Sequence, residues 1–344
     1  FINAGLSQTE EIRNKLLEFK KTKKPIIAYG EIYSQSAYYL ASVANQIYLN
    51  PNGLIELKGL SAQIMFYKGL LKKLDIDMQI IRHGKFKSAI EPFTLDKMSN
   101  ENREQISLFL NSISDNLMDS ISSQRGLSLK KIQEHANQLS LENAQKCFEL
   151  KYVDALLYED QIEDTLLRIS KNKKINFISL KKYTKIKPKK EHISRNKIAI
   201  IYATGPINSG KGDVNTIGSK TTAKAIKRAR EDKNVKAIVL RINSGGGSAL
   251  ASDVIWRETM LIEKPFVVSM GDYAASGGYY IACAADSIVA NPTTLTGSIG
   301  VFGMIPNIQR FYKNKLGITI DTVNTHRYAD MGFNRPLTNF EKQK

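Results

Sequence analysis

The clearest pattern of apolar and polar positions lies in the second half of the chain. Four apolar runs with the length and the Ile and Val content of buried strands alternate there with segments of helical composition. The predicted strands are residues 198–207, 237–243, 265–270 and 287–292, and the predicted helices are residues 221–230, 249–262 and a segment that runs through Ala285. Alternating apolar strands and helices predict a mainly parallel sheet covered by helices, which is an α/β fold.

The same pattern recurs near the start of the chain. Residues 30–51 align with residues 271–292 at a constant offset of 241, and 8 of the 22 aligned positions are identical. The alignment continues upstream to residue 2 at an offset of 240, and downstream as far as residue 88 at an offset of 242. The chain therefore contains one structural unit twice.

The duplication predicts three parts. Residues 1–170 form an N-terminal repeat, residues 171–197 a basic linker, and residues 198–344 a C-terminal repeat. Residues 99–170 have the apolar spacing of amphipathic helices that cover a sheet. By the alignment, the first repeat lacks its first strand and helix and the second repeat lacks its last helices, so we expect a piece of a longer protein with both repeats truncated.

The net charge of +17 raises the question of a nucleic-acid partner. Residues 171–197 hold 11 Lys or Arg and one acidic residue, so a net +10 of that charge lies in the linker. No zinc-finger spacing and no aromatic RNA-binding motif accompanies it, so we expect no nucleic-acid partner. The linker is interpreted as a solvated connection with an edge strand near its sequence INFISLKKY, and an anionic membrane surface is the alternative partner.

The chain has two cysteines and no apolar run of 18 residues. Cys147 and Cys283 are too few for a disulfide framework and have no metal-ligand spacing, so both are predicted to be small core residues. We expect no metal and no cofactor. The sequence itself predicts no membrane-spanning helix.

A glycine-rich turn between a predicted strand and a predicted helix carries the first candidate for chemistry. Ser276 lies in GDYAASGGYY, where a tight turn exposes the hydroxyl and directs the N–H of Gly277 towards the same point. The sequence SGGGS ends the neighbouring strand and offers a second N–H donor from Gly246. Such turns also occur where they only reverse the chain, so the motif by itself remains a hypothesis.

A serine nucleophile needs a base, and the duplication points to one. Ser276 aligns with Gln35 in the first repeat, whereas Lys87 of the first repeat aligns with Ala329 in the second. We therefore predict one composite site per pair of repeats, with Lys87 as a neutral amine kept so by the apolar residues of GKFKSAIEPF. Among the four histidines, His83 is the alternative base.

These motifs together resemble those of the signal peptide peptidase A (protease IV) family in its long, duplicated bacterial form. GDYAASGGYY is similar to the family's nucleophile motif, NSGGGS to its NSPGGS motif, and GKFKSAIEPF to its lysine motif. The resemblance implies a serine–lysine dyad of Ser276 and Lys87, oxyanion donors at Gly246 and Gly277, and a Ser298 that orients the lysine. It also implies two Clp/crotonase-like repeats. Gly245 stands where the family usually has proline.

The resemblance further implies a membrane-associated endopeptidase that degrades cleaved signal peptides and other apolar peptides through an acyl-enzyme. An anchor outside this chain would hold it at the bacterial inner membrane with its catalytic part facing the periplasm, as a ring-like homo-oligomer. The sequence leaves open whether Lys87 meets Ser276 within one chain or between chains.

Two other functions are compatible with the same fold. A crotonase-like acyl-CoA enzyme would show acyl-CoA hydrolysis or hydration that does not depend on Ser276. A non-catalytic peptide-binding scaffold would bind peptides unchanged after Ser276→Ala and show no turnover.

Overall fold

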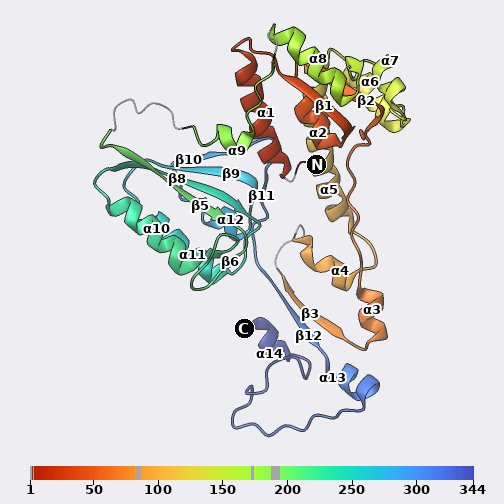
Figure 1. Ribbon diagram of the computed structural model, residues 1–344. Coiled ribbons are helices and arrows are strands. Elements are labelled where there is room, and N and C mark those ends of the chain that lie inside the picture. The colour runs from red at the N-terminus through yellow and green to blue at the C-terminus, as the bar shows by residue number, and fades with distance from the viewer. Residues whose placement is uncertain (1, 3, 83–86, 172–173, 187–193) are drawn as a thin grey trace.

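The computed structural model describes residues 2, 4–82, 87–171, 174–186 and 194–344. Figure 1 shows two α/β units side by side and, beyond them, a two-stranded ribbon with short helices. Each unit contains strands in parallel register covered by helices. The predicted α/β class with mainly parallel sheets is therefore confirmed.

The first unit is built around a three-stranded parallel sheet with the order β1-β2-β4. Its strands are β1 (Ile27–Tyr33), β2 (Gln46–Ile55) and β4 (Ala155–Leu156). Its helices are α1 (Leu6–Lys20), α2 (Gln35–Ala41), α5 (Asn100–Arg125), α6 (Leu129–Asn137), α7 (Ala144–Glu149) and α8 (Glu159–Ser170). The segment 99–170 is thus largely helical, as its apolar spacing predicts.

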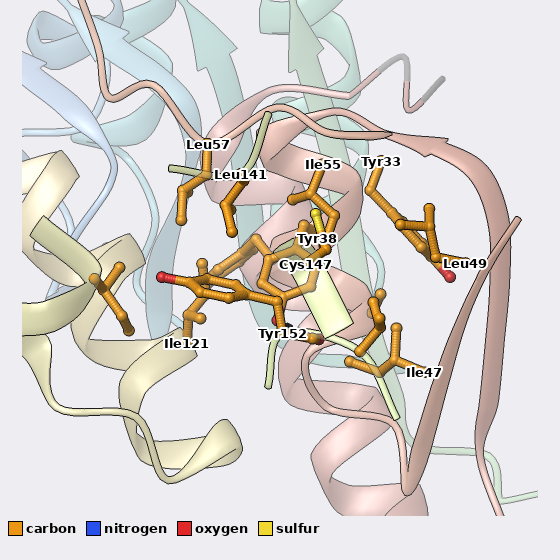
Figure 2. Close-up of a cluster of buried hydrophobic side chains, with 14 of the residues drawn as sticks. Tyr33, Tyr38, Ile47, Leu49, Ile55, Leu57, Ile121, Leu141, Cys147 and Tyr152 are labelled. Carbon is orange, nitrogen blue, oxygen red and sulfur yellow. Dashed lines mark hydrogen bonds between the residues drawn. The ribbon is translucent and has the colours of Figure 1, made fainter. Parts of the chain in front are cut away.

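The core of the first unit packs fully buried tyrosines, among them Tyr38 and Tyr152, against aliphatic side chains of β2 and α5 (Figure 2). The Tyr38 hydroxyl donates a hydrogen bond to the Tyr152 carbonyl oxygen at 2.7 Å, so its polar end is satisfied inside the core. Cys147 is fully buried here, as predicted. The apolar stripe of α5 is only partly buried, because Ile113 and Leu117 enter the core whereas Leu108 is 66% exposed.

The second unit holds the larger sheet, with the order β10-β9-β8-β5 and β11 paired beside β9. Its strands are β5 (Lys197–Thr204), β8 (Val235–Ser244), β9 (Phe266–Ala275), β10 (Ser287–Val289) and β11 (Leu295–Gly297), with the short pair β6 (Ile207–Asn208) and β7 (Ile217–Gly218). Its helices are α10 (Ser219–Glu231), α11 (Ala249–Thr259) and α12 (Gly277–Tyr280). Alternate residues of β8 are buried, including Ile238, Leu240 and Ile242, because one face of this strand forms the core.

The edge strand predicted in the linker is wrong. Residues 175–179 pair with no strand in the described structure, and the helical turn α9 (Leu180–Tyr183) follows them. Ser179 begins this turn, since its hydroxyl accepts a hydrogen bond from the Lys182 N–H. A local cap therefore determines the conformation at this position.

A ribbon of two antiparallel strands connects the units at their far end (Figure 1). It pairs β3 (Asp77–Arg82) with β12 (Phe302–Asn307). Short helical turns flank it: α3 (Lys68–Lys73), a 3₁₀ turn (Ser88–Ile90), α4 (Glu91–Thr94), α13 (Gln309–Phe311), a π-helical turn (Tyr312–Leu316) and α14 (Asn339–Gln343). None of the helices that the structure describes is long and apolar enough to cross a membrane.

A second contact between the units lies at the start of α1. The Asp272 carboxylate of β9 accepts hydrogen bonds from the N–H groups of Ser7 and Gln8 at 2.9 and 3.1 Å. A carboxylate suits this position because the first N–H groups of a helix have no partner within the helix. The Glu11 carboxylate lies 2.7 Å from the Arg241 guanidinium of β8 and extends the contact.

Candidate active site

Ser276 lies at the point where β9 ends and α12 begins. Its backbone has φ 52° and ψ −119°, a conformation that a residue with a side chain rarely adopts. The Ser276 N–H donates to the Gly297 carbonyl oxygen at 2.8 Å, so the neighbouring strand β11 holds the turn in place. Strained turns of this kind present a side chain at the end of a strand, as a nucleophile elbow does.

The Lys87 amine reaches this serine within the same chain. Its Nζ lies 3.5 Å from the Ser276 Oγ, 2.7 Å from the Ser298 carbonyl oxygen and 3.1 Å from the Ser298 Oγ. Ser298 follows β11 directly, and β11 is parallel to β9, which ends beside Ser276. The structure therefore brings together three residues that the sequence predicted to act together, although they are up to 211 positions apart.

The surroundings of Lys87 favour the neutral amine. The side chain is buried, with 9% of the residue exposed, and this burial lowers the pKa of the Lys87 amine from its ordinary value. The three oxygen atoms around Nζ belong to a carbonyl group and two hydroxyl groups, so none of them carries a charge. A neutral amine has two N–H groups and one lone pair. The N–H groups can donate to the two Ser298 oxygens, which leaves the lone pair free to accept a proton from Ser276.

The predicted oxyanion donors lie next to each other. A Cβ atom added to Gly246 would come within 2.6 Å of the Gly277 nitrogen, and Gly246 has φ 97°. Gly277 is the first residue of α12, where an N–H has no acceptor in its own helix. The Gly246 N–H donates to the Ser244 Oγ at 3.1 Å. To bind a substrate oxygen, it would have to break this hydrogen bond or donate to both oxygens. Both roles therefore stay predictions.

A cavity of about 290 Å³ opens beside Ser276. Its walls are mainly apolar or uncharged and come from α11, α12 and the segment after Ser298. The lining residues are Gly247, Ala249, Ser276, Gly277, Tyr279, Tyr280, Cys283, Ile299, Gly300 and Val301. A cavity with this lining accommodates an apolar side chain next to the serine hydroxyl.

Cys283 was predicted to be a core residue, and this prediction is wrong. It is exposed and lines the cavity. The Ala-rich sequence around it is typical of a buried helix. The regular helix α12, however, ends at Tyr280, and the turns that follow leave the Cys283 thiol beside the cavity.

The position of Lys87 depends on a strand ladder and a buried carboxylate, neither of which the sequence motifs predicted. The ladder of β3 with β12 pairs Arg82 with Phe302, which lie five residues before Lys87 and four residues after Ser298, so the ladder brings these two residues towards each other. On the other side of Lys87, the buried Glu91 carboxylate accepts from the Ser99 N–H at 3.1 Å, the Ser99 hydroxyl at 2.6 Å and the Asn102 side-chain amide at 2.8 Å. The sequence GKFKSAIEPF could have indicated this role of Glu91, because a carboxylate that is buried among apolar residues requires hydrogen-bond donors.

The histidines do not form a site with Ser276 among the described residues. His135 contacts the Tyr152 hydroxyl in the first unit, and His326 is exposed beside Thr325. His83, the alternative base, and His192 lie outside the described residues. In the part of the chain that the structure describes, no group of three or more His, Cys, Asp or Glu is placed to hold a metal ion.

Among the described residues of the first repeat, the positions that align with Ser276 and Gly246 do not form an equivalent site. Gln35, which aligns with Ser276, begins α2, and its side-chain oxygen accepts from the Gly59 N–H at 3.0 Å. Leu6, which aligns with Gly246, begins α1. The strained turn is not kept either, since the residue before α2 is Ser34 with φ −64°, whereas Ser276 precedes α12 with φ 52°.

The model of peptidase family S49 matches residues 18–175 and 259–344, which together make up more than half of the chain. The chain belongs to peptidase family S49. It is 37% identical to "Protease 4" of Haemophilus influenzae over 98% of the chain and 57% of that protein. It is 38% identical to "Protease 4" of Salmonella typhi over 98% and 56%, and 37% identical to "Serine protease SPPA, chloroplastic" of Arabidopsis thaliana over 96% and 50%.

The predicted family is therefore confirmed, and with it the predicted class at the level of the family, a serine peptidase. The chain spans about half the length of these curated relatives.

Proposed function

We propose that this S49 chain carries the catalytic centre of a membrane-associated serine endopeptidase, in which Ser276 is the nucleophile and Lys87 the general base. The observation that carries the proposal is the contact of the buried Lys87 amine with the Ser276 hydroxyl at 3.5 Å. Ser276 occupies a strained strand-to-helix turn, and Ser298 supplies two further contacts to the amine. These are the parts that an activated serine needs: an exposed hydroxyl, a base, and a group that orients the base.

In the proposed mechanism, the neutral Lys87 amine removes the proton from the Ser276 hydroxyl while Oγ attacks the peptide carbonyl carbon. The N–H of Gly277, with that of Gly246, stabilises the oxyanion. The Lys87 ammonium then gives its proton to the leaving amine, and the acyl-enzyme remains on Ser276. Water attacks the acyl-enzyme, Lys87 takes the proton from this water, and the carboxylic acid product leaves as Ser276 regains its hydrogen.

The cavity beside Ser276 supports apolar peptides as substrates, because its lining would bury an apolar side chain of the substrate. Cleaved signal peptides fit this chemistry, and the resemblance to signal peptide peptidase A names them as substrates. The same resemblance supports a homo-oligomer at the bacterial inner membrane with its catalytic part facing the periplasm.

The test compares hydrolysis of a fluorogenic apolar peptide by the full-length protein and its variants. Ser276→Ala and Lys87→Ala should each lower kcat/KM by at least about 100-fold, the usual size of a lost nucleophile or general base. The matched control Lys73→Ala removes an exposed lysine of α3 in the same repeat and should retain full activity. Substantial activity in Lys87→Ala would mean that another base acts, with His83 the next candidate. Turnover that persists in Ser276→Ala would contradict the proposal as a whole.

A further inference from the structure

The segment that joins the two units exposes a group of large apolar side chains. It lies on the path from α8 of the first unit to β5 of the second (Figure 1). The structure describes residues 174–186 of it, and every residue in this range except Ile175 is exposed. The large apolar residues among them, each more than half exposed, are Phe177, Ile178, Leu180, Tyr183 and Ile186. Single apolar side chains are common on protein surfaces, whereas several within one short segment mark a binding surface.

The helical turns of this segment separate its apolar residues from its lysines. The N–H groups from Lys182 to Ile186 donate to carbonyl oxygens three or four residues earlier, so helical turns continue beyond the end of α9 at Tyr183. Leu180, Tyr183 and Ile186 recur every three residues and therefore share one face of these turns. The lysines of the same turns lie towards the other face: Lys181, Lys182 and Lys185. The turns are thus amphipathic.

The same segment is positively charged. Residues 174–186 contain four lysines and no Asp or Glu. Among the residues that the structure describes, none of these four lysines forms an ion pair. A surface that is both apolar and positively charged is complementary to a partner that presents negative charge above an apolar layer.

The composition of the segment distinguishes between the kinds of partner. Interfaces between proteins are depleted in lysine, and their aromatic cores are accompanied by arginine and methionine instead. Nucleic acids attract lysine through their phosphates but leave aliphatic side chains such as those of Leu180 and Ile186 in water. Helices that lie on a membrane surface, in contrast, combine a lysine-rich face with a face of Leu, Phe and other apolar residues. A membrane with anionic lipids therefore fits both properties of the segment.

We propose that residues 174–186, the linker patch, lie on the surface of an anionic phospholipid bilayer. Phe177, Leu180 and Ile186 enter the boundary between headgroups and acyl chains, and the long lysine side chains hold their amines at the level of the lipid phosphates. The inference rests on the membrane association in the proposed function and adds to it a contact that lies within this chain. It does not involve the peptidase chemistry.

The charge and the tethering together set the strength of this contact. One lysine near an anionic lipid surface strengthens binding about fivefold, so Lys181, Lys182 and Lys185 together contribute roughly 100-fold. A patch of this size binds weakly by itself. In a protein that another segment already holds at the membrane, the contact becomes intramolecular and its effective concentration rises. The linker patch would then be a second point of attachment.

The test places a tryptophan in the patch by Phe177→Trp in the full-length protein, reconstituted into lipid nanodiscs. The nanodiscs contain phosphatidylcholine alone or with one third phosphatidylglycerol, and bromine on the acyl chains quenches tryptophan that reaches them. The emission of the parent protein, which includes that of Trp256, is subtracted. The matched control is Val214→Trp, which replaces an apolar residue that is 87% exposed in the loop between β6 and β7.

The introduced tryptophan at position 177 should be blue-shifted and quenched by brominated lipid in the anionic nanodiscs and not in phosphatidylcholine alone. The one at position 214 should be unaffected by either lipid. Adding Lys181→Gln, Lys182→Gln and Lys185→Gln to Phe177→Trp should weaken the contact roughly 100-fold and abolish the quenching. A matched set removes the same charge from exposed lysines in and after α10 and should retain it: Lys220→Gln, Lys224→Gln and Lys233→Gln.

Three results would overturn the inference: no quenching at position 177 in the anionic nanodiscs, equal quenching in both lipids, or equal loss with the two lysine sets. A blue shift without quenching would mean that a protein surface covers the patch, which contradicts the inference as well. Co-purification of the parent protein with the nanodiscs reports the membrane association itself, and peptide hydrolysis on the same nanodiscs reports the peptidase. Failure of the linker patch is therefore distinguishable from failure of the proposed function.

Discussion

The Ser298 hydroxyl is the most informative single group to remove, because Ser298 holds Lys87 through two separate atoms. Ser298→Ala deletes the Oγ that lies 3.1 Å from the Lys87 Nζ and keeps the carbonyl oxygen at 2.7 Å. One neutral hydrogen bond contributes about 0.5–1.5 kcal/mol, so kcat/KM should fall by about 2- to 10-fold. Lys87→Ala, by comparison, removes the proposed base and should cost at least about 100-fold.

The backbone at Ser298 supplies a matched control. Its φ of 50° lies in the left-handed region, which alanine tolerates no better than serine and glycine adopts freely. Ser298→Gly lacks the same hydroxyl and relieves the strain, so it should lose as much activity as Ser298→Ala and melt at a higher temperature. Equal losses of activity with different Tm values would assign the catalytic effect to the hydroxyl.

The assay is kcat/KM for a fluorogenic apolar peptide measured across a pH series. Burial lowers the pKa of Lys87, and only the neutral amine can accept a proton, so activity should rise with pH through a midpoint below the 10.5 of an ordinary lysine. Ser298→Ala leaves this burial in place and should keep the midpoint below that value. A loss as large as that of Lys87→Ala, or no loss at all, would refute an orienting role for the hydroxyl.

Three further predictions concern the turn, the cavity and the contact between the units. Gly277→Ala would place a Cβ 2.5 Å from the Ser252 Oγ and displace the proposed oxyanion donor, so kcat should fall by about 100- to 1,000-fold. The control Gly69→Ala adds a Cβ where there is open space, so its kcat in the same assay should be unchanged. Cys283→Trp would fill part of the cavity, so kcat/KM should fall for peptides with a large apolar residue at the cleavage site and less for those with alanine there. Asp272→Ala removes the acceptor of two N–H groups at the start of α1 and should lower the free energy of unfolding by about 1.5–3 kcal/mol, measured by denaturant titration.

Much of the site could be predicted from the sequence because the duplication acts as an internal comparison. Ser276 stands out because Gln35 replaces it in the other repeat, and Lys87 stands out because Ala329 replaces it. The apolar runs likewise predicted the parallel strands, although the apolar residues of β5 are not all buried: Ile198 and Ile200 are 67% and 57% exposed.

Predictions of whether a particular side chain is buried were less successful. Cys283 lies in an Ala-rich sequence that is typical of a core, yet it borders the cavity because α12 ends at Tyr280. Leu108 follows the apolar spacing of α5 but is 66% exposed, since only the later turns of that helix reach the core. Apolar spacing identifies the apolar face of a helix and does not identify what covers it.

The sequence by itself determined the α/β class, the duplication, and the two residues whose chemistry is complementary. Only the tertiary structure decided that Lys87 and Ser276 meet within one chain, because that contact depends on the ladder between β3 and β12. Strand pairing over such a distance leaves little local signal, since the hydrogen bonds join backbone groups that every residue except proline has. The burial that lowers the pKa of Lys87 has the same origin, because the surrounding atoms come from both repeats and are assembled only in the folded chain.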